Sequence, residues 1–358
     1  MRYLFFKLFT IHYSLFTFQR VLSQVVELIE NKQHFAITTH VRPDGDGIGS
    51  SLGLWWLLRS LGKEAEVIVS DGIPPTYHSL PGADEIVRVT EVNGKYDAVF
   101  VIECSDVERP NIKNLDAQFT VNIDHHSTCE HFGTINWIDP TASAVGEMIY
   151  NLCKAIGGRI SKEIAECLYM ALVTDTGSFH FPNTTERTLK VASELVKAGV
   201  KPAKISEAVY NSYPWSRIEL MGRVLATVKR DATGRVAWLR QTIEMREETG
   251  MIDGDNNGFV NIPLAAKEIV ASIYMREVRP DFYRVSLRSK GSINVARVAE
   301  NFGGGGHKNA AGCRLEGDWD ECESRIVSAV LEAVTQADEE AIHMTMGHSV
   351  KDMELSLI

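Results

Sequence analysis

The sequence predicts an α/β fold with two domains: an N-terminal domain on a parallel sheet and a smaller mixed α/β domain after it. In the N-terminal part, apolar β-prone runs at 35–39, 96–103 and 119–123 alternate with helical patterns, which is typical of parallel sheets. The second part begins with a strand pattern at 234–241 and has an alternating strand at 282–289. A length of 358 residues is enough for two cores of ordinary size.

The pattern changes along the chain predict where the domains begin and end. Residues 20–205 form the first domain, 206–225 a helical linker, and 226–337 the second domain. Residues 338–358 lack clear periodicity and are expected to form a mobile tail. Residues 1–19 are an aromatic, apolar extension whose uninterrupted apolar runs are too short to span a bilayer. A membrane-surface helix and a segment upstream of the true start both stay open for this extension, and no stable membrane partner is expected.

The stretch after the first predicted strand contains one imidazole and two carboxylates within seven residues, namely His40, Asp44 and Asp46. A helical pattern follows directly, so these side chains lie on a strand-to-helix loop, where the ligands of open α/β sheets gather. Nitrogen and oxygen donors without thiolates suit Mn²⁺, Mg²⁺ or Fe²⁺. The alternative is a polar turn, because Pro, Asp and Gly are ordinary turn residues.

Further ionisable side chains stand where other apolar runs end. They are Asp106, Asp124, His125, His126 and Asp175. A parallel sheet brings the ends of its strands to one edge, so these groups are expected to meet His40 and its neighbours. Such a set can hold two divalent ions with one bridging carboxylate, which suits displacement at phosphorus. For any single Asp, a helix cap or a turn is the alternative.

A glycine run, Gly303–Gly306, follows the helical pattern at 293–302 and leads into His307 and Lys308. Glycine lets backbone N–H groups curl around an anion, so the run is either a phosphate cradle or a flexible linker. Arg288 ends the predicted strand 282–289 and suits bidentate phosphate contact, with a surface charge as the alternative.

The net charge of −10 and the absence of a basic run argue against binding of long nucleic acid, which needs a basic stripe. A local cationic pocket suits mono-, di- or very short oligonucleotides instead. The six cysteines show no C-x-x-C pairing, which favours free thiols in a reducing cytoplasm.

Five motifs in order, HVRPDGDGIGS, VIECSD, DHH, TDTGSF and GGGGHKNAAG, resemble the DHH phosphoesterase family with its DHH-associated C-terminal domain. The resemblance covers about residues 20–335 and is strongest to the nano-RNase A type, the bifunctional oligoribonucleases and PAP phosphatases. It implies hydrolysis of very short RNA and of 3′-phosphoadenosine 5′-phosphate (PAP), with 20–205 as the metal-binding catalytic domain and 226–337 as the substrate-binding domain.

The resemblance also implies two metal sites with a shared ligand. One ion would be held by His40 and Asp44, the other by Asp46, His125 and Asp175, and Asp106 would bridge them. One departure is Glu103, where relatives often carry Asp at the strand end. Because it stands three residues before Asp106, we interpret it as a supporting residue.

The remaining roles follow in the same way. The implied catalytic residues are Asp106, Asp124, His125 and His126, with Asp124 supporting the metal ligands and His126 contacting phosphate or protonating the leaving oxygen. The residues implied to hold the terminal phosphate of the substrate are Arg288, Ser289, Gly304, Gly305, Gly306 and His307.

The resulting hypothesis is a two-metal phosphoesterase in which a metal-bound water attacks phosphorus in a cleft between the domains. The expected cofactors are two divalent ions, with Mn²⁺ favoured over Mg²⁺ and Fe²⁺. A phosphodiesterase for cyclic or linear dinucleotides and a catalytically inactive nucleotide-binding sensor stay open as alternatives. A homodimer is one expected assembly, and the order of substrates and the cleavage polarity are not fixed by the sequence.

Overall fold

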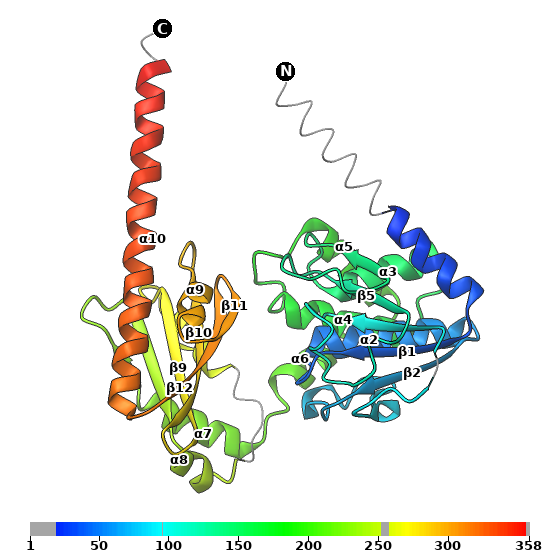
Figure 1. Cartoon of the computed structure of the whole chain (residues 1–358), viewed down its shortest axis with the longest axis horizontal. Helices are drawn as coiled ribbons and strands as arrows, with labels where there is room; N and C mark the ends of the chain where they lie inside the picture. Colours follow the sequence, from blue (N-terminus) through cyan, green and yellow to red (C-terminus); the bar gives the residue numbers. More distant parts are fainter. Residues whose placement is uncertain (1–18, 95, 252–257, 356–358) are drawn as a thin grey trace. The chain divides into compact units, whose positions relative to one another are not determined.

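The computed structural model describes residues 19–94, 96–251 and 258–355, with side chains apart from His307 and residues 343–355 (Figure 1). The chain divides between Ser212 and Tyr213 into two compact units. Unit 1 has a parallel sheet and unit 2 a mixed one, so the predicted α/β class is confirmed.

Unit 1 is built on a six-stranded sheet in the order β3-β2-β1-β4-β5-β6, with every neighbouring pair parallel. The strands are β1 (His34–Thr39), β2 (Glu64–Val69), β3 (Val87–Arg88), β4 (Ala98–Ile102), β5 (Thr120–Asp124) and β6 (Ile135–Ile138). The strand order reverses between β1 and β4. In open α/β sheets, ligands bind outside the carboxyl ends of the strands at such a reversal.

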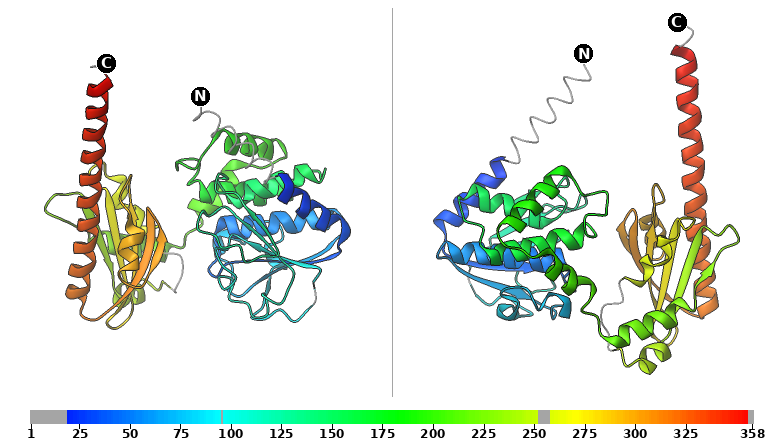
Figure 2. Two further views of the ribbon diagram at one scale, coloured as in Figure 1. Left: turned by 45° about the horizontal axis from the view of Figure 1, so that its top comes forward. Right: turned by 180° about the vertical axis from the view of Figure 1, so that it is seen from behind.

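Helices cover one face of this sheet, and loops cover the other (Figures 1 and 2). Residues 19–31 are helical, and the helices that follow are α2 (Gly45–Ser60), α3 (Val145–Ala155), α4 (Lys162–Asp175), α5 (Glu186–Lys197) and α6 (Pro202–Tyr210). Single turns of 3₁₀ helix lie at Pro75–Tyr77 and Ala83–Glu85.

The close approach of α2 and α4 depends on glycine. A Cβ at Gly49 would lie 2.5 Å from the Cys167 carbonyl oxygen, and one at Gly45 would lie 2.5 Å from Thr174 Oγ1. Real Cβ atoms do not approach other atoms so closely, so side chains at these positions would push α4 away. The glycines of α2 therefore bring the first turn of α2 to the end of α4, where Asp175 lies.

Unit 2 has a sheet in the order β11-β12-β10-β9-β8-β7, in which only β8 and β9 are parallel neighbours. Its elements are α7 (Trp215–Leu225), β7 (Lys229–Arg230), β8 (Val236–Gln241), α8 (Ile243–Glu248), β9 (Ala271–Arg279), β10 (Phe282–Ser289), α9 (Val295–Glu300), β11 (Gly305–His307), β12 (Ala310–Glu316) and α10 (Trp319–Leu355), with 3₁₀ turns at Phe259–Asn261 and Pro263–Ala265. Helices α9 and α10 pack on one face of the sheet and α7 packs on the other.

Two segments differ from their predicted character. The predicted linker 206–225 contains α7, whose Leu220 and Val224 are buried against Leu239 of β8, so this helix is part of unit 2. From residue 338 the predicted mobile tail continues α10 as far as Leu355. The reason is local, because this stretch has no proline and contains many good helix formers, which extend a helix without an apolar stripe.

The predicted N-terminal extension lies outside the described residues up to position 18. Within the described part of the chain, no helix is long and apolar enough to cross a membrane.

The glycine run is part of a β-hairpin. Gly305 and Gly306 belong to β11 and pair with Gly312 and Ala311 of β12. A Cβ at Gly304 would overlap the Gly312 carbonyl oxygen and lie 2.7 Å from Cys313 Cα, whereas one at Gly305 would meet nothing within 4 Å. The run is therefore fixed by backbone packing and is not a loose linker.

Replacement of Gly304 by alanine should destabilise unit 2, because the new methyl group has no space against β12. We expect a loss of about 1–3 kcal/mol, the usual cost of overpacking. Thermal unfolding followed by circular dichroism measures it. Gly305→Ala is the matched control and should melt within about a degree of the wild type, since its methyl group meets open space. Equal melting temperatures for the two variants would contradict the packed hairpin.

Candidate metal site

The ionisable groups of unit 1 meet at the carboxyl ends of β1, β4 and β5, beside the reversal of strand order. His40 follows β1 directly, Glu103 follows β4, and His125 follows β5. Asp46 lies in the first turn of α2, and Asp175 is the last residue of α4. Five elements of secondary structure thus direct ligand-type side chains to one place.

Among the described residues, three groups of side chains have ligand atoms within 4.8 Å of one another. They are His40, Asp44 and Glu103; Asp46, Glu103, His125 and Asp175; and Glu103, His125 and His126. Glu103 belongs to all three groups, so the cluster has one central carboxylate. His40 Nε2 lies 3.5 Å from Glu103 Oε2, and His125 Nε2 lies 3.6 Å from Asp175 Oδ2.

Glu103 is held in an unfavourable environment. Its side chain is only 4% exposed, Oε2 has no hydrogen-bond partner among the residues that the structure describes, and its φ of 57° lies in the left-handed region that non-glycine residues rarely adopt. Burial, then the charges of Asp44 and Asp46, raise its pKa well above the usual value for Glu. Backbone strain and a buried carboxylate among like charges are tolerated where function requires them, and a bound cation would relieve the repulsion.

Gly47 gives the Glu103 carboxylate its space. A Cβ at position 47 would lie 3.1 Å from Glu103 Oε2 and 2.5 Å from Thr39 Oγ1. A side chain here would therefore displace the carboxylate from the centre of the cluster.

Both histidines direct Nε2 toward the carboxylates. His40 Nδ1 lies 2.9 Å from the Val41 carbonyl oxygen, and His125 Nδ1 lies 3.1 Å from the Ala142 carbonyl oxygen. A carbonyl can only accept, so each Nδ1 carries the hydrogen and each Nε2 is available as a ligand. His125 Nε2 is buried and has no hydrogen-bond partner within the described part of the chain.

Two carboxylates of the cluster are fixed by helix N-termini. Asp44 caps α2, and its Oδ1 accepts from the Asp46 and Gly47 N–H groups at 3.0 Å each. Asp46 is fully buried and accepts from the Val145 N–H at 2.7 Å and the Gly146 N–H at 3.0 Å, at the start of α3. Donors at a helix start and the helix dipole both stabilise an anion there.

The structure does not bring Asp106 into any of the three groups. Its Oδ1 accepts from the N–H groups of Glu108 and Arg109 at 3.0 and 2.9 Å, so its carboxylate caps a turn. Glu103, and not Asp106, lies at the centre of the three groups. The sequence signal that could have identified Glu103 is its position at the end of a strand. Glu103 directly follows β4, which ends at Ile102, just as His40 directly follows β1.

Asp124 is arranged to support the histidines after it. Its Oδ1 accepts from the His125 N–H, the His126 N–H and His126 Nδ1, the last at 2.7 Å. Burial alone would raise its pKa, but the His126 hydrogen bond and charge outweigh burial and lower it to about 2. Asp124 therefore stays ionised and fixes the His126 ring.

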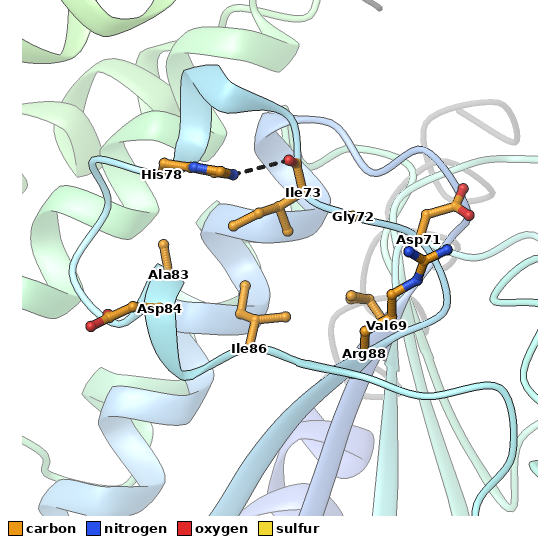
Figure 3. A pocket seen from close by; sticks show the side chains of 9 residues that line it. All are labelled: Val69, Asp71, Gly72, Ile73, His78, Ala83, Asp84, Ile86 and Arg88. Atoms are coloured by element: carbon orange, nitrogen blue, oxygen red, sulfur yellow. Dashed lines mark hydrogen bonds between the residues drawn. The ribbon is translucent and has the colours of Figure 1, made fainter. Parts of the chain in front are cut away.

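A pocket of about 430 Å³ lies beside β2, and one of its lining residues, Asp71, contacts the loop after β1 (Figure 3). Ile73 and Ile86 point toward one another across it. Asp71 Oδ2 accepts from the Arg42 N–H at 3.0 Å. Arg42 has a φ of 52°, so Asp71 holds the loop after His40 in a strained turn.

In unit 2, the residues predicted to hold phosphate lie around the end of β10. Arg288 pairs with Ala310 of β12, and the Asn309 side chain donates to Ser289 Oγ at 2.9 Å, which ties the two loops together. The Arg288 guanidinium is half-buried, burial lowers its pKa, and no carboxylate among the described residues pairs with it. Gly304–Gly306 form the neighbouring hairpin edge, and the His307 side chain lies outside the described part.

Comparison with known families bears on both units. Residues 34–172 match the DHH family, N-terminal domain, and residues 241–336 match the DHHA1 domain. A relative from Thermus thermophilus, named bifunctional oligoribonuclease and PAP phosphatase NrnA, is 35% identical over 320 residues, which cover 89% of this chain and 95% of the relative. This chain belongs to the DHH family.

Other members of the DHH family agree with this assignment. The protein of the same name from Bacillus subtilis is 29% identical over 84% of this chain and 95% of its own length. The crystal structure of an exopolyphosphatase-related protein from Bacteroides fragilis matches with a TM-score of 0.84 and 31% identity, covering 89% of this chain and 98% of that one. The similarity thus extends over both units.

The metal-free protein should lose stability as the pH rises from 5 to 8. Burial and the charge of Asp46 raise the pKa of Asp175 to about 7, far above its ordinary value of 3.8. Stability associated with a raised pKa is present at low pH and is lost as pH rises through the folded-state value, where Asp175 must ionise beside Asp46. The pKa of Glu103 is raised as well and acts in the same direction.

Melting temperatures of the chelator-treated protein at pH 5, 6, 7 and 8 measure this dependence. Asp175→Asn removes the group that titrates and should flatten the curve. A variant with the same pH dependence as the wild type would show that Asp175 is not the cause.

Proposed function

We propose that this chain is a metal-dependent phosphoesterase that hydrolyses short oligoribonucleotides and PAP. The observation that carries the proposal is the cluster around Glu103, in which carboxylates and imidazoles are gathered together and the buried Glu103 Oε2 and His125 Nε2 have no hydrogen-bond partner among the described residues. The names of the relatives from T. thermophilus and B. subtilis support the substrate class.

We propose that His40, Asp44 and Glu103 hold one ion, and that Asp46, Glu103, His125 and Asp175 hold the other. Glu103 then replaces Asp106 as the shared ligand. When bound, two such ions supply an activated water and neutralise charge on the phosphoryl oxygens. Oxygen and imidazole donors without thiolates favour Mn²⁺, and Mg²⁺ and Fe²⁺ are compatible with the same set.

His126 is the proposed proton donor to the leaving oxygen. Because Asp124 stays ionised and binds Nδ1, the hydrogen on Nδ1 is retained and the ring is fixed. A second hydrogen on Nε2 can then be given to the leaving oxygen, as in general acid catalysis.

In unit 2, Arg288 and the backbone of Gly304–Gly306 are the proposed contacts of the terminal phosphate, together with Ser289 and His307. A half-buried guanidinium without a carboxylate partner among the described residues supports this, since phosphate is the partner that it matches. We also infer a cytoplasmic location, because all six cysteines are free thiols.

The shared ligand can be identified by two matched amide substitutions. Glu103→Gln removes the central charge and should lower kcat with Mn²⁺ by more than about 100-fold, beyond the 10–100-fold typical of groups outside the ligand set. Asp106→Asn changes only a turn cap and should keep kcat within about tenfold of the wild type. The reverse order of the two losses would return the bridging role to Asp106.

The substrate class is tested by one set of hydrolysis assays with Mn²⁺. The substrates are RNA dimers to pentamers, a long RNA, PAP, a cyclic dinucleotide and pyrophosphate, and Glu103→Gln serves as the control for contaminating nucleases. We expect rapid loss of the short RNAs and PAP, with the long RNA spared, because the chain has no basic surface run for it. Preference for the cyclic dinucleotide, or no turnover at all, would contradict the proposal.

A further inference from the structure

The segment between β6 and α3, residues Asp139–Glu147, touches the metal cluster without supplying a ligand to it. Its backbone bonds directly to two of the proposed ligands and is linked to a third through one side chain, and each of the three comes from a different part of unit 1. The N–H groups of Val145 and Gly146 donate to Asp46 of α2. The Ala142 carbonyl oxygen accepts from His125 Nδ1 after β5.

The third connection runs through Asn183. Its side-chain amide donates to the Ser143 carbonyl oxygen at 3.0 Å, to the Asp175 carbonyl oxygen at 3.1 Å and to Asp175 Oδ2 at 3.3 Å. Asn183 thereby fixes the Asp175 carboxylate relative to Ser143. The segment thus sets the positions of Asp46, His125 and Asp175 relative to one another.

One buried side chain holds this segment in shape. Glu147 is fully buried, and its Oε2 accepts from the Ser143 N–H at 3.2 Å and from Ser143 Oγ at 2.8 Å. Its Oε1 accepts from Arg187 Nε of α5, and Thr188 Oγ1 contributes a longer bond to Oε2 at 3.4 Å. Arg187 also reaches Asp139 Oδ2 at 3.4 Å, so both ends of the segment are tied to α5.

Stability alone is a weak reason for this arrangement. A buried carboxylate paired with a cation whose side chain is 43% exposed contributes little to folding, because desolvation offsets the attraction, and apolar packing would serve as well. The Glu147 carboxylate instead orients the segment. It accepts two hydrogen bonds from Ser143, and the segment is thereby turned so that its backbone groups face the proposed ligands. Groups that orient metal ligands in this way control metal affinity.

We propose that Glu147, acting through Ser143 and held by Arg187, is a positioning residue that sets the affinity of the cluster for divalent metal. The inference rests on the proposed function, because it takes Asp46, His125 and Asp175 as ligands. It predicts that the metal affinity, not the substrate affinity, responds to changes at Glu147.

The test is calorimetric titration of the chelator-treated full chain with Mn²⁺ for the wild type and Glu147→Gln. The amide keeps the shape but cannot accept from Arg187 and Ser143 together. We expect Mn²⁺ affinity to fall by about 10–100-fold, with kcat largely recovered at saturating Mn²⁺ and KM for an RNA dimer unchanged.

Glu323→Gln is the matched control. Glu323 is also mostly buried and also accepts from two cations, Lys229 at 3.0 Å and Arg240, but it belongs to unit 2, whereas all the proposed metal ligands belong to unit 1. Its Mn²⁺ affinity should equal that of the wild type. If Glu147→Gln shows no cooperative melting, Arg187→Lys tests the same connection at a half-exposed site and should weaken Mn²⁺ binding in the same direction.

Unchanged Mn²⁺ affinity in a folded Glu147→Gln or Arg187→Lys variant would overturn the inference, and so would an equal loss in Glu323→Gln. A wild type that binds Mn²⁺ and responds to Glu147→Gln as expected, yet hydrolyses none of the phosphoesters, would support the inference and contradict the proposed function.

Discussion

The mutual repulsion of Asp44, Asp46, Glu103 and Asp175 is the constraint on which unit 1 depends. Burial and neighbouring negative charge raise the pKa values of Asp46, Glu103 and Asp175. Keeping these carboxylates together therefore destabilises the metal-free protein. A flexible scaffold would relieve the repulsion by moving the side chains apart. The surrounding structure must therefore hold them in place.

Hydrogen bonds from backbone groups hold many of these side chains in place. Helix starts donate to Asp44 and Asp46, carbonyl oxygens fix Nδ1 of His40 and His125, and the Asp139–Glu147 segment joins three of the proposed ligands. Glycines at positions where a Cβ would collide allow these elements to approach closely. The architecture is thus shaped by the need to bring charged groups near one another, and divalent cations are the partners that this arrangement suits.

The parts of the site that depend on local pattern could be predicted from the sequence. His40, Asp44 and Asp46 lie between the end of β1 and the first turn of α2, and the α/β class follows from the alternation of strands and helices. The central position of Glu103 was not predicted, because a choice between two carboxylates three residues apart depends on where the strand ends and how the turn folds. The Asp139–Glu147 segment was also missed, since it acts through backbone N–H and C=O groups that every sequence contains.

Two features of unit 2 also could not be predicted from local sequence pattern. The sequence allowed two interpretations of the glycine run, a phosphate cradle and a flexible linker. The flexible linker is excluded by β12, whose atoms occupy the space that side chains in the run would need. The helix beyond residue 338 was not predicted, because the prediction relied on apolar periodicity and this stretch has no apolar stripe.

The most direct test of a shared ligand at Glu103 is a crystal structure with Mn²⁺ in which anomalous scattering locates the ions. The account predicts two Mn²⁺ peaks in unit 1, one beside His40 and Asp44 and one beside Asp46, His125 and Asp175, with the Glu103 carboxylate touching both. A single peak, or two peaks joined by Asp106 with Glu103 turned away, would contradict it.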